Sequence, residues 1–288
     1  MNTISFMSAN FVARELGCRM TQGWMEGDAA TQSWFRPEET FAERFDAMLG
    51  EVAGLGFSAI DLWVAHLHPA WATPFHIETA RALLAKHGLS VASFAYYVED
   101  PAGLDKLAEI ARGLDCRLIG GGCASALLKE RRGELVKALE RNDLLIGLEN
   151  HPEKTAAEVL DKIGDSAGGR IGVAMDTGWF GTQGYDAAKA ILELSDRLLH
   201  VHLKDIHEPF KGGGEVEDIR EGGVVTLKDM GHETCALGDG IVSIERCVSA
   251  LKEIGYAGGI SIEHEPEDHD PMPEIKVSLE RLHTWLNQ

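Results

Sequence analysis

Short apolar segments alternate with longer amphipathic segments along most of the chain. Apolar residues with a two-residue period predict β-strands, and apolar residues repeated every three or four positions predict α-helices. The predicted strands cover residues 3–7, 58–63, 89–95, 117–121, 144–149, 170–176, 197–203 and 259–264. The predicted helices cover residues 38–54, 75–87, 102–114, 125–141, 155–164, 185–194, 243–254 and 273–286.

Residues at the ends of several predicted helices support these boundaries. Pro37 precedes an acidic first turn, and Gly88 follows a basic last turn. Thr155 stands three residues before Glu158, which is the spacing of a capping box at a helix N-terminus.

Strands that alternate one for one with helices are the pattern of a closed parallel barrel. We therefore predict an α/β protein with the (β/α)8 TIM-barrel fold, in which residues 1–288 form a single domain. An open, doubly wound sheet is the alternative. Such a sheet carries a glycine-rich fingerprint after its first strand, and this sequence has none there.

Two long connections interrupt the alternation of strands and helices. They cover residues 8–36 and 204–242, and the second contains two glycine clusters. Long connections in a compact domain are usually lids or binding elements. In a barrel, both would lie at the C-terminal face, where barrel enzymes carry out their chemistry. The alternative is that they are disordered or contact another subunit.

Four consecutive strands in the C-terminal half place polar residues on one face. Side chains in a strand point alternately to its two faces. In each of these strands one face carries branched apolar residues. On the other face, the residues at the C-terminal end of the strand are charged or are histidines, and those before them are mostly small. The polar face carries Glu149, Asp176, His200, His202, Lys204, Glu263 and Glu265. Unpaired buried charges are costly, so one shared cavity with a bound cation is indicated.

The metal-ligand set read from this pattern is Glu149, Asp176, His202 and Glu263. Three carboxylates and one imidazole suit an octahedral divalent ion that keeps positions open for water or substrate oxygens. We predict one divalent metal ion, with manganese expected and magnesium, cobalt or zinc as alternatives. Taken singly, each residue is also explained by a helix cap, a turn or a surface ion pair. His200 is expected to be a core histidine bonded to a backbone carbonyl.

Other residues are candidates for contacting a substrate. Lys204 shares the phase of His202 and would either bind a substrate oxygen or form an ion pair, for example with Glu265. His151 shares the phase of Glu149 and is a candidate for contacting a sugar hydroxyl. Aromatic residues are more often simple core residues. Trp63 and Trp179, at strand ends, are nevertheless candidates for an aromatic wall against a sugar.

The amino-acid composition limits the classes of molecule that this protein is expected to bind. The chain has 27 Lys and Arg against 46 Asp and Glu, a formal net charge of −19. This balance argues against nucleic acid and against anionic membrane surfaces, and no apolar stretch is long enough to span a bilayer. Five scattered cysteines and the lack of a secretory signal predict reduced thiols in a cytoplasmic protein. A small-molecule carbohydrate is the expected partner, and a homo-oligomer is left open.

Five short segments carry a resemblance to a known family. They are Gly147–Pro152, Ala174–Gly178, His200–Asp205, Leu237–Gly240 and Ile260–Glu265. These segments resemble the xylose isomerase-like sugar isomerase and epimerase superfamily, which includes tagatose epimerases, hydroxypyruvate isomerases and inosose dehydratases. The metal positions of that family fall on Glu149, Asp176, His202 and Glu263.

Two positions differ from the epimerase pattern. Trp179 and Glu208 stand where the epimerases usually carry a histidine and an arginine. The run from His202 to Asp205, followed by a long insertion, is more similar to the inosose dehydratase branch.

The resemblance implies chemistry on an α-hydroxycarbonyl compound. A metal that binds both substrate oxygens stabilises the enediolate formed when the intervening C–H bond is broken. Glu149 and Glu263 are the candidate base and acid, and Lys204 is a candidate to polarise the carbonyl. The expected function is a metal-dependent isomerase or epimerase of a small ketose or keto-polyol. The alternatives are an inosose dehydratase-like lyase that eliminates water and a non-catalytic carbohydrate-binding protein.

Overall fold

A closed ring of parallel strands forms the centre of the computed structural model, which describes residues 2–210 and 226–288. Around the ring the order is β1 (Thr3–Met7), β10 (Gly259–Ile262), β7 (Leu198–Leu203), β6 (Ile171–Asp176), β5 (Leu145–Glu149), β4 (Leu118–Gly121), β3 (Ser90–Ala95) and β2 (Ala59–Trp63). Strand β1 pairs in parallel with both β2 and β10, which closes the barrel. The predicted (β/α)8 TIM-barrel fold is therefore confirmed.

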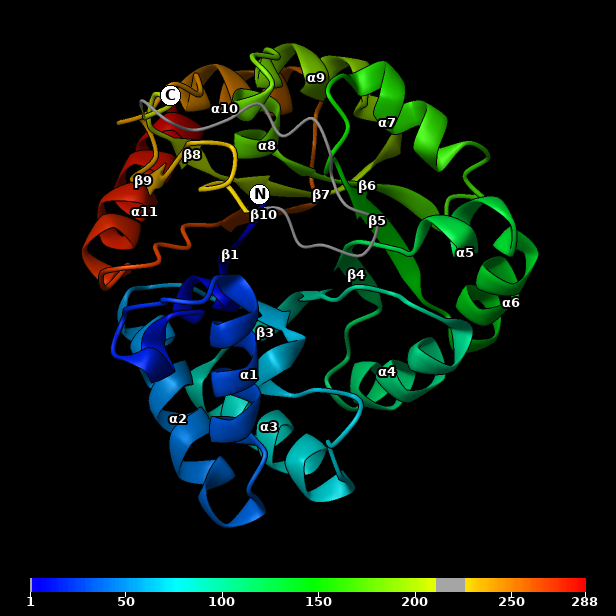
Figure 1. The fold of residues 1–288 in the computed structure, drawn as a ribbon, viewed down its shortest axis with the longest axis vertical. Coiled ribbons are helices and arrows are strands. Elements are labelled where there is room, and N and C mark those ends of the chain that lie inside the picture. The colour runs from blue at the N-terminus through cyan, green and yellow to red at the C-terminus, as the bar shows by residue number, and fades with distance from the viewer. Residues whose placement is uncertain (1, 211–225) are drawn as a thin grey trace.

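Helices surround the barrel on its outside (Figure 1). They are α1 (Trp24–Phe35), α2 (Glu38–Gly54), α3 (Pro74–His87), α4 (Pro101–Gly113), α5 (Ser125–Lys129), α6 (Arg132–Asn142), α7 (Ala156–Ile163), α8 (Thr177–Thr182), α9 (Ala187–Glu193), α10 (Ile244–Glu253) and α11 (Met272–Asn287). Within the described part of the chain, none of these helices combines the length and the apolar character that a membrane crossing requires.

The apolar faces of the strands pack beneath these helices. The outward residues Ile146, Leu148, Val173, Met175, Val201, Leu203, Ile260 and Ile262 all belong to the main core. Helix α2 adds Phe41 and Phe45, whose rings stack 5.0 Å apart and are fully buried. Burying such side chains contributes roughly 1.5–3 kcal/mol each. The predicted apolar outer face of β5, β6, β7 and β10 is therefore confirmed.

The predicted helix ends agree with the structure at three places. Pro37 is the N-cap of α2, and Gly88 ends α3 with a left-handed φ of 67° that favours glycine. Thr155 caps α7 by accepting a hydrogen bond from the Glu158 N–H. The Glu158 carboxylate accepts from the Lys154 N–H rather than from Thr155, so only half of the predicted capping box forms.

The single helix predicted over 125–141 is wrong. Two helices, α5 and α6, cover this segment. The N–H groups of Glu130 and Arg131 both donate to the Ala126 carbonyl, so the helical hydrogen-bond ladder stops there. Arg131 then precedes α6 and pairs with Glu134 in its first turn. The amphipathic period continues across the break, which is why the pattern did not reveal it.

The two long connections contain more regular structure than predicted. Two short 3₁₀-helices and α1 lie within 8–36, which is therefore not a plain loop. Within 204–242, Asp205–Ile206 (β8) and Thr234–Cys235 (β9) form a small antiparallel pair. The two glycine clusters of that connection fall in 211–225, outside the described residues. Helix α8, which follows β6 directly, was not predicted.

Small residues inside the barrel leave room for a buried histidine. A Cβ atom at Gly259 would lie 2.7 Å from the His200 ring, and one at Gly120 would lie 3.6 Å from it. His200 is fully buried in this space. The glycine at position 259 therefore allows an imidazole to occupy the barrel interior, whereas a Cβ at Gly120 would make only an ordinary van der Waals contact.

Candidate metal centre

Four neighbouring strands bring the predicted metal ligands together. Glu149 ends β5, Asp176 ends β6, His202 lies near the end of β7, and Glu263 directly follows β10. Each residue offers a ligand atom that lies within 4.8 Å of the ligand atoms of the other three. In the sheet register, His202 is level with Asp176 on one side and with Ser261 on the other.

Asp176 is held in a fixed orientation. Its Oδ1 accepts a hydrogen bond from the Trp179 N–H at 3.0 Å, so one carboxylate oxygen caps α8. The Asn150 side chain brackets the Asp176 backbone, since it donates to the carbonyl at 2.9 Å and accepts from the N–H at 2.7 Å. The second oxygen, Oδ2, faces the Lys204 ammonium at 3.0 Å. Asp176 is thus both a helix cap and a member of the cluster.

The imidazole of His202 faces two glutamates. Its Nδ1 lies 2.9 Å from Glu263 Oε2 and 3.9 Å from Glu149 Oε1. Burial alone would lower the pKa of His202, but Glu263 and Glu149 outweigh it and raise this pKa well above the ordinary value. Burial would likewise raise the pKa of Glu263, but Lys204 and His202 hold it well below its usual range.

Lys204 is a buried ammonium surrounded by carboxylates. Its Nζ lies 2.9 Å from Glu263, 3.0 Å from Asp176 and 3.3 Å from Glu265. Burial alone would lower the pKa of Lys204, but these carboxylates raise it well above the ordinary value. Gly178 makes room for the lysine stem, since a Cβ there would lie 2.8 Å from the Lys204 Cγ. The predicted ion pair with Glu265 is present.

Burial raises the pKa of two carboxyl groups, those of Asp176 and Glu265, so they bind a proton more readily than in water. It raises the pKa of Asp176 to about 6 and that of Glu265 to about 8, although the Lys204 charge lowers both. With Glu265 protonated at neutral pH, the carboxylates of Glu149, Asp176 and Glu263 face the positive charges of Lys204 and His202. Among these five described residues one negative charge is left in excess, which a divalent cation would offset.

The donor set fits a divalent metal ion. Among the described residues, Asp176 Oδ2, Glu263 Oε2 and both ring nitrogens of His202 are buried and make no hydrogen bond of good geometry. They face only charged neighbours in the cluster, at 2.9–3.6 Å. Buried polar atoms are almost always hydrogen-bonded in proteins, so several such atoms at one point are consistent with a ligand site. Carboxylate oxygens with one imidazole nitrogen are suitable ligands for Mn²⁺, Mg²⁺, Co²⁺ or Zn²⁺.

Two of the predicted substrate residues stack on each other. The rings of His151 and Trp179 lie 3.8 Å apart with an interplanar angle of 13°. Burial lowers the pKa of His151, which favours the neutral ring. Its buried Nε2 has no hydrogen-bond partner among the described residues and is available to a ligand. The Lys204 Nζ is 5.9 Å from the Trp179 ring centre, so this stack borders the cluster.

Trp63 belongs to a different part of the barrel face. It is buried in a small apolar cluster and contacts Trp24 with a ring separation of 4.8 Å. Trp24 in turn lines a cavity of about 400 Å³ between the first βα connection and the connection after β7. The other described residues that line it are Met20, Thr21, Gln22, Gly23, Met25, Thr226, Lys228, Asp229 and Glu267. Both long connections thus border one cavity.

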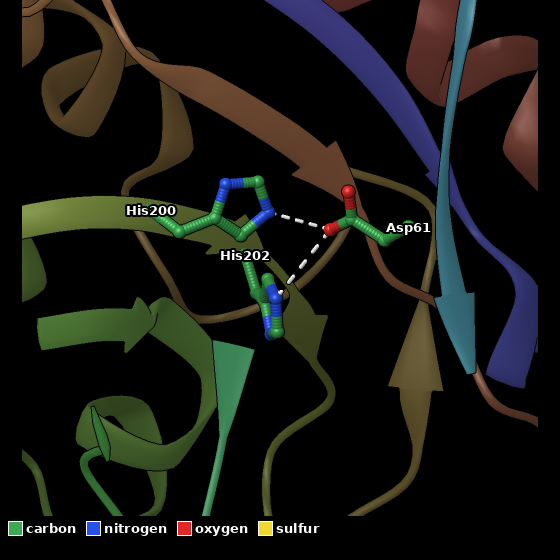
Figure 2. A group of neighbouring side chains, drawn as sticks. All are labelled: Asp61, His200 and His202. Carbon is green, nitrogen blue, oxygen red and sulfur yellow. Dashed lines mark hydrogen bonds and ion pairs between the residues drawn. The ribbon is translucent and has the colours of Figure 1, made fainter. Parts of the chain in front are cut away.

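Sequence reasoning missed a buried carboxylate beside the cluster. Asp61, on β2, is fully buried, and its Oδ2 lies 2.5 Å from His200 Nε2 and 3.6 Å from His202 Nε2 (Figure 2). The prediction that His200 bonds to a backbone carbonyl is therefore wrong, because its partner is this carboxylate. The only sequence signal was a single aspartate within the otherwise apolar strand residues 59–63.

The closed parallel barrel and the cluster of carboxylates and one imidazole at its C-terminal strand ends define this protein as a TIM barrel with a candidate metal centre. The model of the family described as xylose isomerase-like TIM barrel matches residues 49–286, and the chain belongs to this family. This confirms the family indicated by the sequence segments.

Two curated relatives are enzymes. An inosose dehydratase of Klebsiella pneumoniae is 30% identical over 118 residues, which cover 40% of this chain and 38% of that protein. The match thus spans well under half of that relative. A D-psicose 3-epimerase of Enterocloster bolteae is 22% identical over 244 residues, covering 72% of this chain and 78% of that protein.

A solved structure supports the fold over nearly the whole chain. The crystal structure of a xylose isomerase-like TIM barrel protein from Mycobacterium smegmatis in complex with magnesium has a TM-score of 0.68 and 18% identity. The match covers 99% of this chain and 96% of that chain.

Proposed function

We propose that this protein is a divalent-metal-dependent sugar isomerase or epimerase that acts on a small ketose or keto-polyol. The observation that carries the proposal is the convergence of four ligand atoms within 4.8 Å at the end of the barrel where such enzymes act. The relatives named as a sugar epimerase and an inosose dehydratase support a small carbohydrate as substrate.

In this proposal the metal is held by Glu149, Asp176, His202 and Glu263. When bound, a divalent ion acts as a Lewis acid that stabilises negative charge developing on the substrate oxygens. Manganese is our first choice because the donor set is rich in oxygen, and magnesium, cobalt and zinc remain alternatives. The magnesium complex of the M. smegmatis protein is compatible with this range.

Glu149 is the proposed base and Glu263 the proposed acid. Glu263 is ionised in the free protein because Lys204 and His202 lower its pKa, so it must take up a proton before it returns one to the substrate. The Glu149 side chain is 23% exposed against 6% for Glu263, so Glu149 is more accessible to an incoming substrate. Lys204 stays protonated at neutral pH, since its pKa is well above the ordinary value. In this proposal it donates a hydrogen bond to a substrate carbonyl oxygen in place of one of its three carboxylate partners, and it does not act as a base.

The stacked pair of His151 and Trp179 is the proposed sugar platform. An aromatic face suits the apolar C–H face of a sugar, and the free Nε2 of His151 would bind a hydroxyl group. Trp63, with its partner Trp24 beside the cavity, is a proposed second wall.

Hydrogen exchange with solvent tests the proposed function. The protein is loaded with Mn²⁺ and incubated in D₂O with D-psicose, D-tagatose or an inosose. We expect deuterium at the carbon next to the carbonyl in at least one of them, together with an isomer or epimer. The absence of exchange in every substrate, in protein shown to hold metal, would contradict the proposal and favour a non-catalytic carbohydrate-binding protein.

A second candidate function is an inosose dehydratase-like lyase. The observation that favours it is the buried, protonated Lys204, a group able to assist departure of a hydroxyl, in the run from His202 to Asp205. The similarity to an inosose dehydratase also supports it. In the same experiment, a product lighter than the substrate by one water molecule would select the lyase.

The affinity for Mn²⁺ is expected to increase with pH from about pH 5 to pH 8. Burial raises the pKa of Asp176 to about 6, so below that pH a proton competes with the metal for this carboxylate. His202 has a raised pKa and must also lose a proton to bind the ion. Titrations that follow the electron paramagnetic resonance signal of free Mn²⁺ at several pH values measure this dependence. A constant affinity over this range would contradict the assigned ligands.

A cytoplasmic location is part of the proposal. The cysteines Cys18, Cys116, Cys123, Cys235 and Cys247 are free thiols. Burial raises the pKa of Cys116 and Cys247 to about 12, so these thiols stay protonated and unreactive. Free thiols throughout a chain are typical of a reducing compartment.

A further inference from the structure

Asp61 places a negative charge inside the barrel, where most strand positions of β2 are apolar. Its side chain has no exposed surface. Its Oδ2 lies 2.5 Å from His200 Nε2 and 3.6 Å from His202 Nε2, so two imidazoles face one carboxyl oxygen. Burying a charge costs desolvation free energy, and an apolar residue of the same size would often make the fold as stable or more stable. A functional reason for keeping this carboxylate is therefore expected.

The His202 ring lies between Asp61 and the candidate metal ligands. Its Nε2 faces Asp61 Oδ2 at 3.6 Å (Figure 2). Its Nδ1 faces Glu263 Oε2 at 2.9 Å. One ring nitrogen thus points to the cluster and the other to the carboxylate behind it. A histidine that binds a metal through Nδ1 carries its proton on Nε2, and this N–H needs an acceptor.

We propose that Asp61, anchored by His200, is a positioning residue that fixes the orientation and tautomer of His202 so that Nδ1 binds the metal. The inference rests on the proposed metal-dependent function and adds residues that the ligand set does not contain. Outer carboxylates of this kind typically account for 10- to 100-fold in metal affinity.

His200 has the geometry of an anchor. Its Nε2 lies 2.5 Å from the same Oδ2 of Asp61 that faces His202, and both histidines come from β7. The ring fits because Gly259 lacks a side chain at this level, since a Cβ atom there would lie 2.7 Å from it. His200 thereby holds the carboxylate against β7, at the height of the His202 ring.

The Asp61→Asn variant tests the proposal through metal binding rather than through activity. Asparagine keeps the size of the side chain but removes the negative charge that faces His202 Nε2 at 3.6 Å. We expect the dissociation constant for Mn²⁺, measured from the resonance signal of free Mn²⁺, to rise about 10- to 100-fold. Nitrogen NMR of a metal-loaded sample, with Mg²⁺ as the diamagnetic ion, should find the His202 proton on Nε2 in the wild type.

A matched control is available on the barrel exterior. Asp46 of α2 contacts His87 Nε2 at 2.6 Å, so it forms a similar carboxylate–histidine pair away from the cluster. The Asp46→Asn variant should bind Mn²⁺ like the wild type. This control separates a specific effect on His202 from a general effect of losing an aspartate–histidine pair.

A pair of His200 variants keeps the test decisive if Asp61→Asn does not fold. His200→Gln retains an N–H donor that reaches Asp61, whereas His200→Leu removes it. We expect Gln to keep most of the Mn²⁺ affinity and Leu to lose about tenfold. Wild-type affinity in Asp61→Asn or in His200→Leu overturns the inference, even if their melting temperatures fall. A wild-type protein that binds no divalent ion overturns the proposed function itself, which is a different result.

Discussion

The Glu149→Gln variant is expected to lose turnover by about 10²- to 10⁴-fold while keeping its fold, because a positioned acid or base contributes this much to a proton transfer. The Glu149 carboxylate has one ion-pair contact among the described residues, to His202 at 3.9 Å, so its loss removes little stabilisation. The rate of deuterium incorporation into substrate measures the first effect. Thermal unfolding followed by circular dichroism measures the second.

Glu158→Gln, on α7 and away from the cluster, is the matched control and should exchange hydrogen at the wild-type rate. Glu263→Gln is expected to lose turnover and also stability, because Glu263 contacts both Lys204 and His202 at 2.9 Å. Full activity in Glu149→Gln would refute its assignment as the base.

The Lys204→Met variant is expected to destabilise the metal-free protein by about 3–5 kcal/mol, because breaking a buried ion-pair network leaves uncompensated charge. The ammonium is 2% exposed and lies within 3.3 Å of Asp176, Glu263 and Glu265. Its removal leaves these carboxylates to repel one another. Denaturant unfolding in the presence of a chelator measures the loss.

A divalent ion should restore part of the stability that Lys204→Met loses. The ion would replace the missing positive charge among the carboxylates, and binding to the native state alone adds stability by mass action. The melting temperature of the variant should therefore rise more with added Mn²⁺ than that of the wild type. Lys86→Met, in an exposed pair with Asp46, should change little under either condition. An equal response of Lys204→Met and wild type would contradict this role of Lys204.

The sequence predicted the barrel and the grouping of the candidate metal ligands because both follow from local patterns. Alternating apolar and polar positions in β5, β6, β7 and β10 predicted which side chains face inward, and the ends of parallel strands meet at one face. Glu149, Asp176, His202 and Glu263 could thus be grouped before their distances were known. For Asp176, the sequence was equally consistent with a simple turn and with a metal ligand. In the structure Asp176 both caps α8 and faces Lys204 in the cluster.

Features that depend on contacts between distant residues were not predictable from these patterns. Asp61 and His200 are 139 positions apart, and only the closure of the barrel brings them together. The break between α5 and α6 arises from two N–H groups that share the Ala126 carbonyl, which leaves the apolar period unchanged. Gly27 of α1 packs closely against the segment around Val12. The apolar pattern of α1 is too weak to predict either the helix or this contact.

Anomalous scattering from crystals grown with Mn²⁺ tests the central claim most directly. The account predicts a strong manganese peak bonded to Glu149, Asp176, Glu263 and the Nδ1 of His202. A metal-saturated crystal with no peak between these side chains, or with the ion bound elsewhere on the barrel, would contradict it.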